Sequence, residues 1–428
     1  MARRRRRTAS TWVNPFQQMM SAMAGVGTQM MGQMMGTAVK RAGQQMVSAV
    51  SASNRLAGHC TVARRRRADT GRQVAVVVQK ALADNVAAAR KAVAPLLPRA
   101  EVAKKTRKSV KPVKAARPAK PAVSAGVRHR RQAREREPHQ GLAISAGGVR
   151  RYELWMPPGT RARQRLPLVV MLHGCKQDMA SFSAQTRMHR LAEKGRFGVL
   201  YVEQDQVANP MRCWNWFALD AGRALSEVSI IRAAIRDVCH KYPLNPGAVS
   251  LVGLSAGAGM AALMASRHPG EFVAVAMHAG VPPGSAREAR GAIAAMKGER
   301  LPDALLHEAG GELPALLVVQ GLADEVVNRR NGQAAARLWA SACGAKARPA
   351  RELKRGSRYP MKVTDYVVNT RLRVRLCEIS KLGHAWSGAD ARHAFSDPAG
   401  PDASRLTWRF IADVLRQRQP ASRKVASK

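Results

Sequence analysis

Beyond Gly141, the apolar and polar positions of the chain alternate between two periods. Short runs of consecutive apolar residues predict buried strands, and the segments between them repeat apolar residues at helical spacing. This alternation is typical of βα units that build a mostly parallel sheet flanked by helices. We expect an edge strand at 151–156, further strands at 166–173, 197–202, 249–254, 272–277, 315–320 and 372–379, and helices at 178–195, 225–242, 256–267, 331–342 and 404–418.

The residues before this region follow a different pattern. Met19, Met23, Met30 and Met34 are spaced as one face of a helix, which we expect within about residues 14–50. Because Met is flexible and polarizable, this face suits an irregular apolar surface such as a partner helix, a lipid interface or a polymer granule. Packing on the protein itself or on a second copy remains an equal alternative. The repeated Lys-Pro and Arg-Pro steps of residues 104–121 predict an extended, solvated linker.

Charge divides the chain at the same place. The 428 residues carry 72 Lys and Arg against 28 Asp and Glu, a net charge of +44. Residues 1–140 hold 30 of these basic residues, 5 of the acidic ones and only two of the 19 aromatic residues. Such a segment cannot bury enough apolar surface to offset its ordering entropy. We therefore expect a basic, largely disordered arm over 1–140, a globular domain over 141–418 and a basic tail over 419–428.

The N-terminus has no clear targeting signal. Five arginines open the chain, but neither a compact apolar core nor a clear cleavage site follows them, which predicts a cytoplasmic location. Residues 15–39 are uncharged yet interrupted by polar residues, so we expect no membrane span there. The six cysteines show neither a CxxC pair nor a metal-ligand spacing, and we expect no metal or cofactor. Cys239 and Cys377 lie in apolar periodic runs and are expected to be small buried hydrophobes.

A candidate nucleophile lies in the sequence Gly253-Leu-Ser-Ala-Gly257, which matches the pattern G-x-S-x-G. An expected strand precedes it and a helix of small residues follows it, which is the context that this pattern requires. The serine must sit on a sharp strand-to-helix turn so that its oxygen projects above the sheet, and the flanking glycines leave room for that turn. We therefore predict that Ser255 is a nucleophile. The alternative is a glycine-rich turn without chemistry.

A serine nucleophile needs a base and an acid that orients the base, and these follow in the order Ser, Asp or Glu, His in α/β-hydrolases. Asp324 comes directly after the expected strand 315–320, with Glu325 as the competing acid. Adjacent side chains point in different directions, so only one of the two can meet the histidine. His384 follows the strand 372–379, where the base is expected. Three residues in this order, each after its own strand, favour a catalytic triad.

An oxyanion formed at the serine needs two backbone donors, one from the residue after the nucleophile and one from an early strand–helix loop. The first is the N–H of Ala256. His173-Gly-Cys175 ends the strand 166–173, so the N–H of Cys175 is the second candidate. A reading of Cys175 itself as the nucleophile would leave Ser255 unexplained.

These motifs together resemble the poly(3-hydroxybutyrate) depolymerase family of esterases, which is related to feruloyl and acetylxylan esterases. The resemblance covers about residues 145–415 and none of the arm. The residues that carry it are Leu166–Cys175 with Gln177, Arg212-Cys-Trp-Asn-Trp-Phe217, Gly253–Gly257, Ala323-Asp324 and Gly383-His-Ala-Trp-Ser-Gly388.

The resemblance implies an α/β-hydrolase fold with Ser255, Asp324 and His384 as triad and Cys175 as an oxyanion donor. It also implies that Trp214, Trp216 and Trp386 lie near an ester-binding cleft, with core packing as the alternative for these rings. Cys175 and Cys213 both fall within its motifs, and we hypothesise that they form a disulfide. For location, the resemblance implies an extracellular protein, against the cytoplasmic prediction from the N-terminus.

We accordingly expect a serine esterase acting on carboxylic esters of the polyhydroxybutyrate type, or alternatively a feruloyl or acetylxylan esterase. A competing hypothesis makes the arm a module that binds nucleic acid or an anionic surface. Because the arm lacks interleaved aromatic residues, such binding would be independent of sequence and sensitive to salt.

Overall fold

The computed structural model describes residues 137–305 and 311–418, all of which lie in one compact unit, Ala122–Lys428. The arm with its expected Met helix and the tail 419–428 lie outside these residues, apart from the last residues before 141. The globular region begins slightly earlier than expected, because the first strand, β1, starts at His139. Within the described ranges no helix combines the length and the apolar character needed to cross a bilayer.

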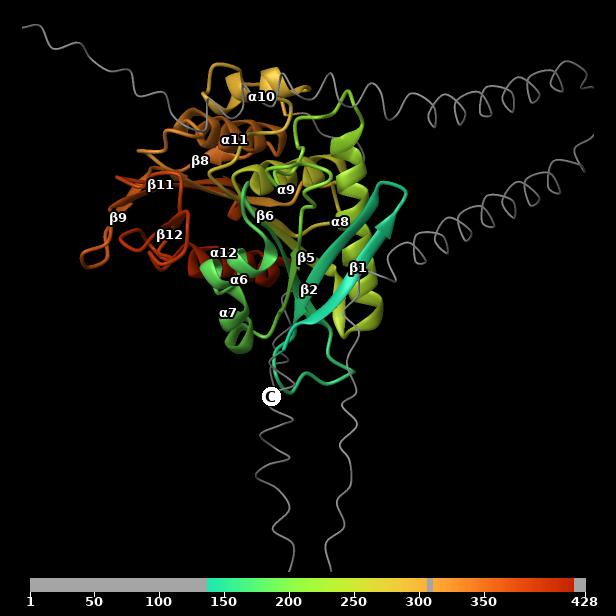
Figure 1. The fold of residues 1–428 in the computed structure, drawn as a ribbon. Helices are drawn as coiled ribbons and strands as arrows, with labels where there is room; N and C mark the ends of the chain where they lie inside the picture. Colours follow the sequence, from blue (N-terminus) through green and yellow to red (C-terminus); the bar gives the residue numbers. More distant parts are fainter. Residues whose placement is uncertain (1–136, 306–310, 419–428) are drawn as a thin grey trace, which may run out of the picture. The chain divides into compact units, whose positions relative to one another are not determined.

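A sheet of eleven strands forms the centre of this unit (Figure 1). Its strands follow the order β1-β2-β4-β3-β5-β6-β7-β11-β10-β8, with β9 paired to β10. The neighbours from β4 to β11 run parallel, and the strands at both ends are antiparallel. The bounds are β1 (His139–Ser145), β2 (Gly148–Trp155), β3 (Leu166–Leu172), β4 (Gly198–Val202), β5 (Leu244–Leu254), β6 (Ala274–His278), β7 (Ala315–Gly321), β8 (Lys346–Ala347), β9 (Arg351–Leu353), β10 (Met361–Val368) and β11 (Arg371–Ile379).

Helices cover both faces of this sheet, each over its own apolar core. The first core joins one face of β3, β4 and β5 to α8 (Arg223–Lys241), α9 (Ala256–Arg267), α10 (Ala289–Met296) and α11 (Arg329–Ala342). The second joins the other face to α6 (Met179–Thr186), α7 (Met188–Gly195) and α12 (Ala403–Arg418). Strands β4, β6 and β7 are buried along their whole length, as continuous apolar runs predict for strands covered on both sides. The predicted α/β-hydrolase fold is thereby confirmed.

Two of the expected elements differ in the structure. The segment 151–156 is not an edge strand, because β1 pairs with β2 and takes the edge. This pairing depends on Gly141, where a Cβ atom would lie 2.3 Å from the Tyr152 ring. The single helix expected at 178–195 is broken at Arg187, which has a φ of 50° and ends α6 by donating its N–H to the Ser183 carbonyl.

Several elements were not expected from the sequence. Strands β8, β9 and β10 fill the segment 344–370, and α10 lies in the segment 281–312. A second, small sheet joins β12 (Trp386–Ser387) to β13 (Ser396–Asp397). Its first strand starts two residues after the expected catalytic histidine, so this small sheet anchors the far side of the histidine loop.

Candidate active site

Ser255 occupies the turn between β5 and α9. Its φ of 55° and ψ of −118° lie outside the regions that a residue with a Cβ atom normally adopts. The carbonyl of Ser255 accepts from the N–H groups of Ala258 and Gly259, and its own N–H donates to the His278 carbonyl at 2.9 Å. These contacts hold the backbone of Ser255 in its strained conformation. A nucleophile exposed on a strand-to-helix turn requires this conformation.

The two glycines around Ser255 allow a contact that no other residue would permit. A Cβ atom on Gly253 would lie 2.2 Å from the carbonyl of Gly257, and one on Gly257 would lie 2.2 Å from the Leu172 carbonyl oxygen. The first turn of α9 therefore packs directly on the ends of β5 and β3. This close packing also brings Ser255 beside the loop that follows β3.

Asp324 and His384 lie in contact, as the candidate acid and base should. His384 Nδ1 is 2.9 Å from Asp324 Oδ2, while Oδ1 of the same carboxylate accepts from the N–H groups of Val326 and Val327. The Asp324 side chain is fully buried and that of His384 is 13% exposed. Glu325, the competing acid, is exposed to solvent. The structure thus pairs the histidine with Asp324.

The loops that carry these two residues are joined backbone to backbone. Leu322 N donates to the Ile379 carbonyl at 2.9 Å, and Ala323 N donates to the Leu382 carbonyl at 3.1 Å. A Cβ atom on Gly321 would lie 2.2 Å from the Leu382 oxygen, so glycine is required at this crossing too. The acid and the base are therefore held side by side at the carboxyl ends of the neighbouring strands β7 and β11.

His278, at the end of β6, connects the serine turn to the histidine loop. Its carbonyl accepts from Ser255 N, and its Nε2 accepts from Ser387 N at 3.2 Å. Burial and the nearby His384 lower the pKa of His278 to about 3, so its ring is neutral. Its Nδ1 is buried and has no partner among the described residues. In the described part of the chain, the contact between Asp324 and His384 is present, but no hydrogen bond joins His384 to Ser255 Oγ.

The loop after β3 presents the second candidate oxyanion donor. Gly174 N donates to Gln177 Oε1 at 2.9 Å, and Lys176 N donates to the Met211 carbonyl at 2.7 Å. The Cys175 N–H between them donates to no acceptor within the described ranges, and the same holds for Ala256 N. Both predicted donors thus keep an N–H that a substrate oxygen can use.

A disulfide between Cys175 and Cys213 holds this loop against the segment that follows β4, with a Cα–Cα distance of 4.2 Å. The hypothesis drawn from the family motifs is confirmed at this pair. Of the two cysteines expected to be buried hydrophobes, Cys377 is buried, but Cys239 is only half-buried. Burial raises the pKa of Cys239 to about 11, so it carries no thiolate at neutral pH.

The three tryptophans that the resemblance places near a cleft are all buried. Trp386 lies in the second core, stacks on His278 and donates from Nε1 to Ser404 Oγ. Trp214 is fully enclosed beside His173, and Trp216 packs over Gly259 of α9. In this structure the rings support the site from within the core. Their contact with a substrate stays a prediction.

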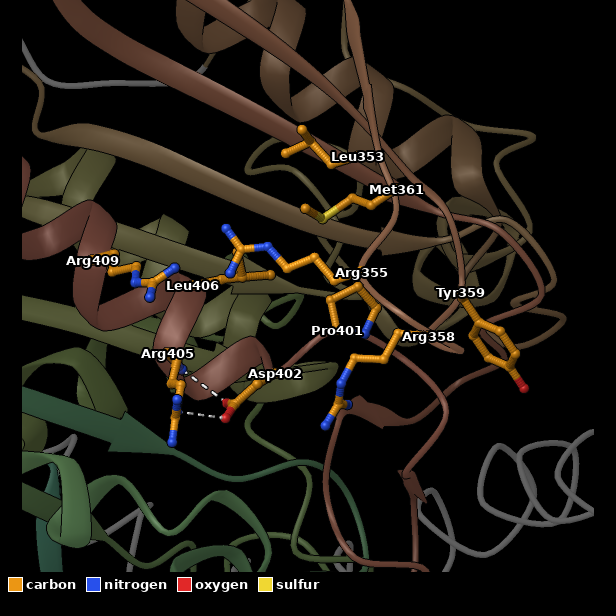
Figure 2. A pocket seen from close by; sticks show the side chains of 10 residues that line it. All are labelled: Leu353, Arg355, Arg358, Tyr359, Met361, Pro401, Asp402, Arg405, Leu406 and Arg409. Carbon is orange, nitrogen blue, oxygen red and sulfur yellow. Dashed lines mark hydrogen bonds and ion pairs between the residues drawn. The ribbon is translucent and has the colours of Figure 1, made fainter.

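The cavities described in the structure are not lined by Ser255, Asp324 or His384. One of about 310 Å³ is lined by the loop after β9 and the start of α12 (Figure 2), and it contains none of the candidate catalytic residues. Within the described ranges, no three His, Cys, Asp or Glu residues gather as metal ligands would.

Sequence reasoning missed three buried polar residues behind the site, namely His278, Gln204 and Glu227. His278 ends an apolar run, where a polar residue is costly unless it is paired, and that cost was a signal that could have identified it. Gln204 stands among polar residues and Glu227 in a stretch of mixed polarity, so neither carries such a signal.

Comparison with known proteins finds a family of esterases. Residues 150–345 match the family model described as Esterase PHB depolymerase, which confirms the resemblance predicted from the sequence. The matched range contains Cys175, Ser255 and Asp324, while His384 lies beyond it.

Similar proteins include poly(3-hydroxyalkanoate) depolymerase C of Paucimonas lemoignei, 36% identical over 117 residues, which are 27% of this chain and 28% of that protein. Feruloyl esterase B of Neurospora crassa is 26% identical over 194 residues, 41% of this chain and 65% of that protein. The chain thus matches less than two thirds of the length of each of these relatives. Among solved structures, an acetyl xylan esterase from Aspergillus awamori aligns with 57% of this chain and 94% of its own, at 16% identity and a TM-score of 0.48.

Proposed function

Because residues 150–345 match a family of esterases, we propose that this protein is a serine esterase that hydrolyses carboxylic esters through Ser255, His384 and Asp324. The observation that carries the proposal is the hydrogen-bonded pair of Asp324 and His384, together with a serine held at a φ of 55° on the turn between β5 and α9. In serine hydrolases the acid fixes the tautomer of the histidine, and the histidine accepts the serine proton.

The reaction begins when His384 Nε2 accepts the proton of Ser255 Oγ and that oxygen attacks the ester carbonyl. The hydrogen bond from Nδ1–H to Asp324 leaves Nε2 as the basic nitrogen and stabilises the imidazolium that forms. His384 then protonates the departing alcohol. A water molecule, deprotonated by the same histidine, cleaves the acyl-enzyme and releases the carboxylic acid.

The tetrahedral intermediate carries a negative oxygen, which the N–H groups of Cys175 and Ala256 stabilise. The N-terminal end of α9 adds its positive dipole at the same point. A single lost donor of this kind typically costs about 3 kcal/mol of barrier. Catalysis therefore depends on the position of the Cys175 peptide as well as on the triad.

For the natural substrate we propose esters of hydroxyalkanoic acids, because two of the similar proteins are named poly(3-hydroxyalkanoate) and poly(3-hydroxybutyrate) depolymerase. Feruloyl or acetylxylan esters are the second candidate. They are favoured by the greater share of the relatives with those names, 65% and 62%, that the chain matches.

The experiment that tests the activity combines turnover with covalent labelling. Wild-type protein should hydrolyse p-nitrophenyl butyrate and incorporate one fluorophosphonate at Ser255, located by peptide mass spectrometry. Absence of both would reject the proposal. A panel of hydroxybutyrate oligomers, methyl ferulate and acetylated xylan then separates the two substrate classes.

A further inference from the structure

A buried carboxylate on α8 lies behind the loop that carries Cys175. Glu227 is 3% exposed and accepts three hydrogen bonds, from Asn215 N at 2.8 Å, Asn215 Nδ2 at 2.6 Å and Gln204 Nε2 at 2.6 Å. Arg150 Nη2 lies 3.9 Å away as the nearest cation. Burial raises the pKa of Glu227, as expected for a carboxyl group removed from water.

Gln204 transmits this contact toward the oxyanion loop. Its Nε2 also donates to the Cys213 carbonyl at 3.0 Å, and its Oε1 accepts from Arg150 Nε at 2.8 Å. Its backbone N–H donates to His173 Nε2 at 3.0 Å. The side chain and the backbone of one residue thus join Glu227, the disulfide segment and His173.

His173 is fully buried, and its pKa is lowered to about 4 by that burial. Because Nε2 accepts a hydrogen bond, the proton of the neutral ring lies on Nδ1, which donates to the Gly174 carbonyl at 2.8 Å. That carbonyl belongs to the same peptide unit as the Cys175 N–H. In a trans peptide the two point in opposite directions, so fixing the carbonyl also aims the N–H.

We propose that Glu227 and His173, connected through Gln204, are positioning residues that aim the Cys175 N–H at the reacting oxygen. The disulfide fixes where Cys175 lies, and the hydrogen-bond network fixes how its peptide is rotated. This role rests on the proposed esterase function, because it has meaning only where an oxyanion forms.

The test is Glu227→Gln, with Glu378→Gln as the matched control. The variant keeps the shape of the side chain but places an amide donor against Asn215 or Gln204, which are themselves donors. The control removes another buried carboxylate, on β11, that accepts from Gln333 Nε2 at 2.7 Å and lies outside the network. The measurements are kcat and KM for p-nitrophenyl butyrate and the inhibition constant of a trifluoromethyl ketone, whose hemiketal oxygen occupies the oxyanion site.

We expect Glu227→Gln to lower kcat by about tenfold or more, because small displacements at a reacting centre have effects of this size. The inhibition constant should rise by the same factor, since kcat and the affinity for this inhibitor both measure stabilisation of the transition state. KM should stay within about twofold. Glu378→Gln should leave both constants unchanged. An unchanged inhibition constant in Glu227→Gln would overturn the proposal while leaving the esterase assignment intact. A wild type without esterase activity would reject both.

If Glu227→Gln does not fold, His173→Asn provides the second variant. Its shorter side chain cannot both accept from Gln204 N and donate to the Gly174 carbonyl. The expected result is the same parallel change in kcat and inhibition constant. If neither constant changed, the result would count against the network.

A second, independent observation concerns the cavity of about 310 Å³ beside α12. It is lined by four arginines, Arg355, Arg358, Arg405 and Arg409, over an apolar floor that includes Met361 and Leu406 (Figure 2). A smaller cavity of about 190 Å³ adjoins it, shares Asp402 and Arg405 with it, and adds Arg187 and Arg190. All the cations of both linings are arginines, whose planar forks bind oxyanions in pairs of hydrogen bonds.

Few of these cations are neutralised within the structure. Among the described residues, Asp402 is the only carboxylate in either lining, and it pairs with Arg405 at 3.2 Å. Arg358 donates to the carbonyls of Pro398 and Gly400. Arg355 and Arg409 form no ion pair with any described residue. Like charges gathered in this way repel one another, and an anionic ligand would relieve that repulsion.

The geometry points to a binding site for a ligand with several phosphate groups in a row, which would lie along the two adjoining cavities. Several guanidinium groups that lack a carboxylate partner can bind several anionic groups at once, so a ligand with repeated phosphates fits this site better than a ligand with one. This inference is independent of the proposed esterase activity.

The test uses the full chain and reads each arginine separately, because the arm is itself basic. Phenylglyoxal modification is followed by peptide mass spectrometry with tripolyphosphate as the probe. Arg355, Arg409 and Arg190 should react about tenfold more slowly at ten times the dissociation constant of the probe. Arg161, exposed outside both cavities, should react as before.

ATP in place of tripolyphosphate distinguishes the source of the phosphates. Stronger protection by ATP indicates a nucleotide, and equal protection indicates a plain phosphate chain. Uniform protection of all arginines, no protection, or equal protection by octanoate would overturn the site.

Discussion

The Cα atom of Gly257 lies against the Leu172 carbonyl, so that any Cβ atom there would be 2.2 Å from the oxygen. This contact joins the first turn of α9 to the end of β3. It therefore sets the distance between the two loops that supply the oxyanion donors, Ala256 and Cys175.

Gly257→Ala tests this contact. Because the added methyl group meets backbone rather than a movable side chain, we expect a loss of about 1–3 kcal/mol in the free energy of unfolding, measured in urea. Ester hydrolysis should fall as well. Gly247→Ala is the control, since the nearest atom to a Cβ there is 3.4 Å away. Equal stability in the two variants would contradict the close packing.

Asp324→Asn tests the acid. The substitution keeps the volume of the side chain but removes the carboxylate that fixes the histidine tautomer, and we expect kcat for p-nitrophenyl butyrate to fall by about 10³–10⁴-fold. Glu325→Gln, at the exposed neighbouring position, should retain wild-type kcat. If Glu325→Gln were the damaging change, the acid would be wrongly assigned.

The two buried histidines predict a dependence of stability on pH. The folded-state pKa values of His173 and His278 are lowered to about 4 and about 3, below the ordinary value of 6.5. Between pH 6.5 and 4 the unfolded chain therefore binds protons that the folded chain does not, so stability falls as the pH falls. Each histidine contributes a slope of about 1.4 kcal/mol per pH unit.

His278→Asn should remove its share of that slope while keeping an acceptor for Ser387 N. Urea unfolding at several pH values between 4 and 7 measures the difference. The same slope in the variant and the wild type would show that His278 is protonated in the folded protein.

Removal of the disulfide should affect stability and turnover together. It closes a loop across 38 positions, for which a loss of about 3–4 kcal/mol is expected when both cysteines are replaced by serine. Since Cys175 carries an oxyanion donor, kcat should fall while KM changes little. Stability is read from thermal unfolding, and a variant with full kcat would show that the hydrogen-bond network alone holds the loop.

The sequence predicted the parallel centre of the fold well, because strands such as β4, β6 and β7 are continuous apolar runs. It failed at the edges. Strand β1 has weak alternation, and its pairing depends on the space above Gly141, which only the folded Tyr152 ring reveals. Strand β10 lies in a stretch of mixed polarity, since Met361 and Val363 are its only two buried residues.

The candidate catalytic residues were predictable for a related reason. The ends of buried strands are easy to find, and Ser255, Asp324 and His384 each follow one. The residues behind them were not, because Glu227 and Gln204 belong to no local pattern. Their contacts join α8, the loop after β4 and the segment 213–215, and only the tertiary structure brings these together.

The bond between Cys175 and Cys213 also ties the competence of the site to the redox state of its surroundings. Disulfides persist in oxidising compartments and are reduced where glutathione and thioredoxin are active. In a reducing compartment the oxyanion loop would keep only its hydrogen bonds, and newly made chains would become fully competent on reaching an oxidant. The proposed esterase activity would then reach its full rate only in a compartment where this disulfide can form.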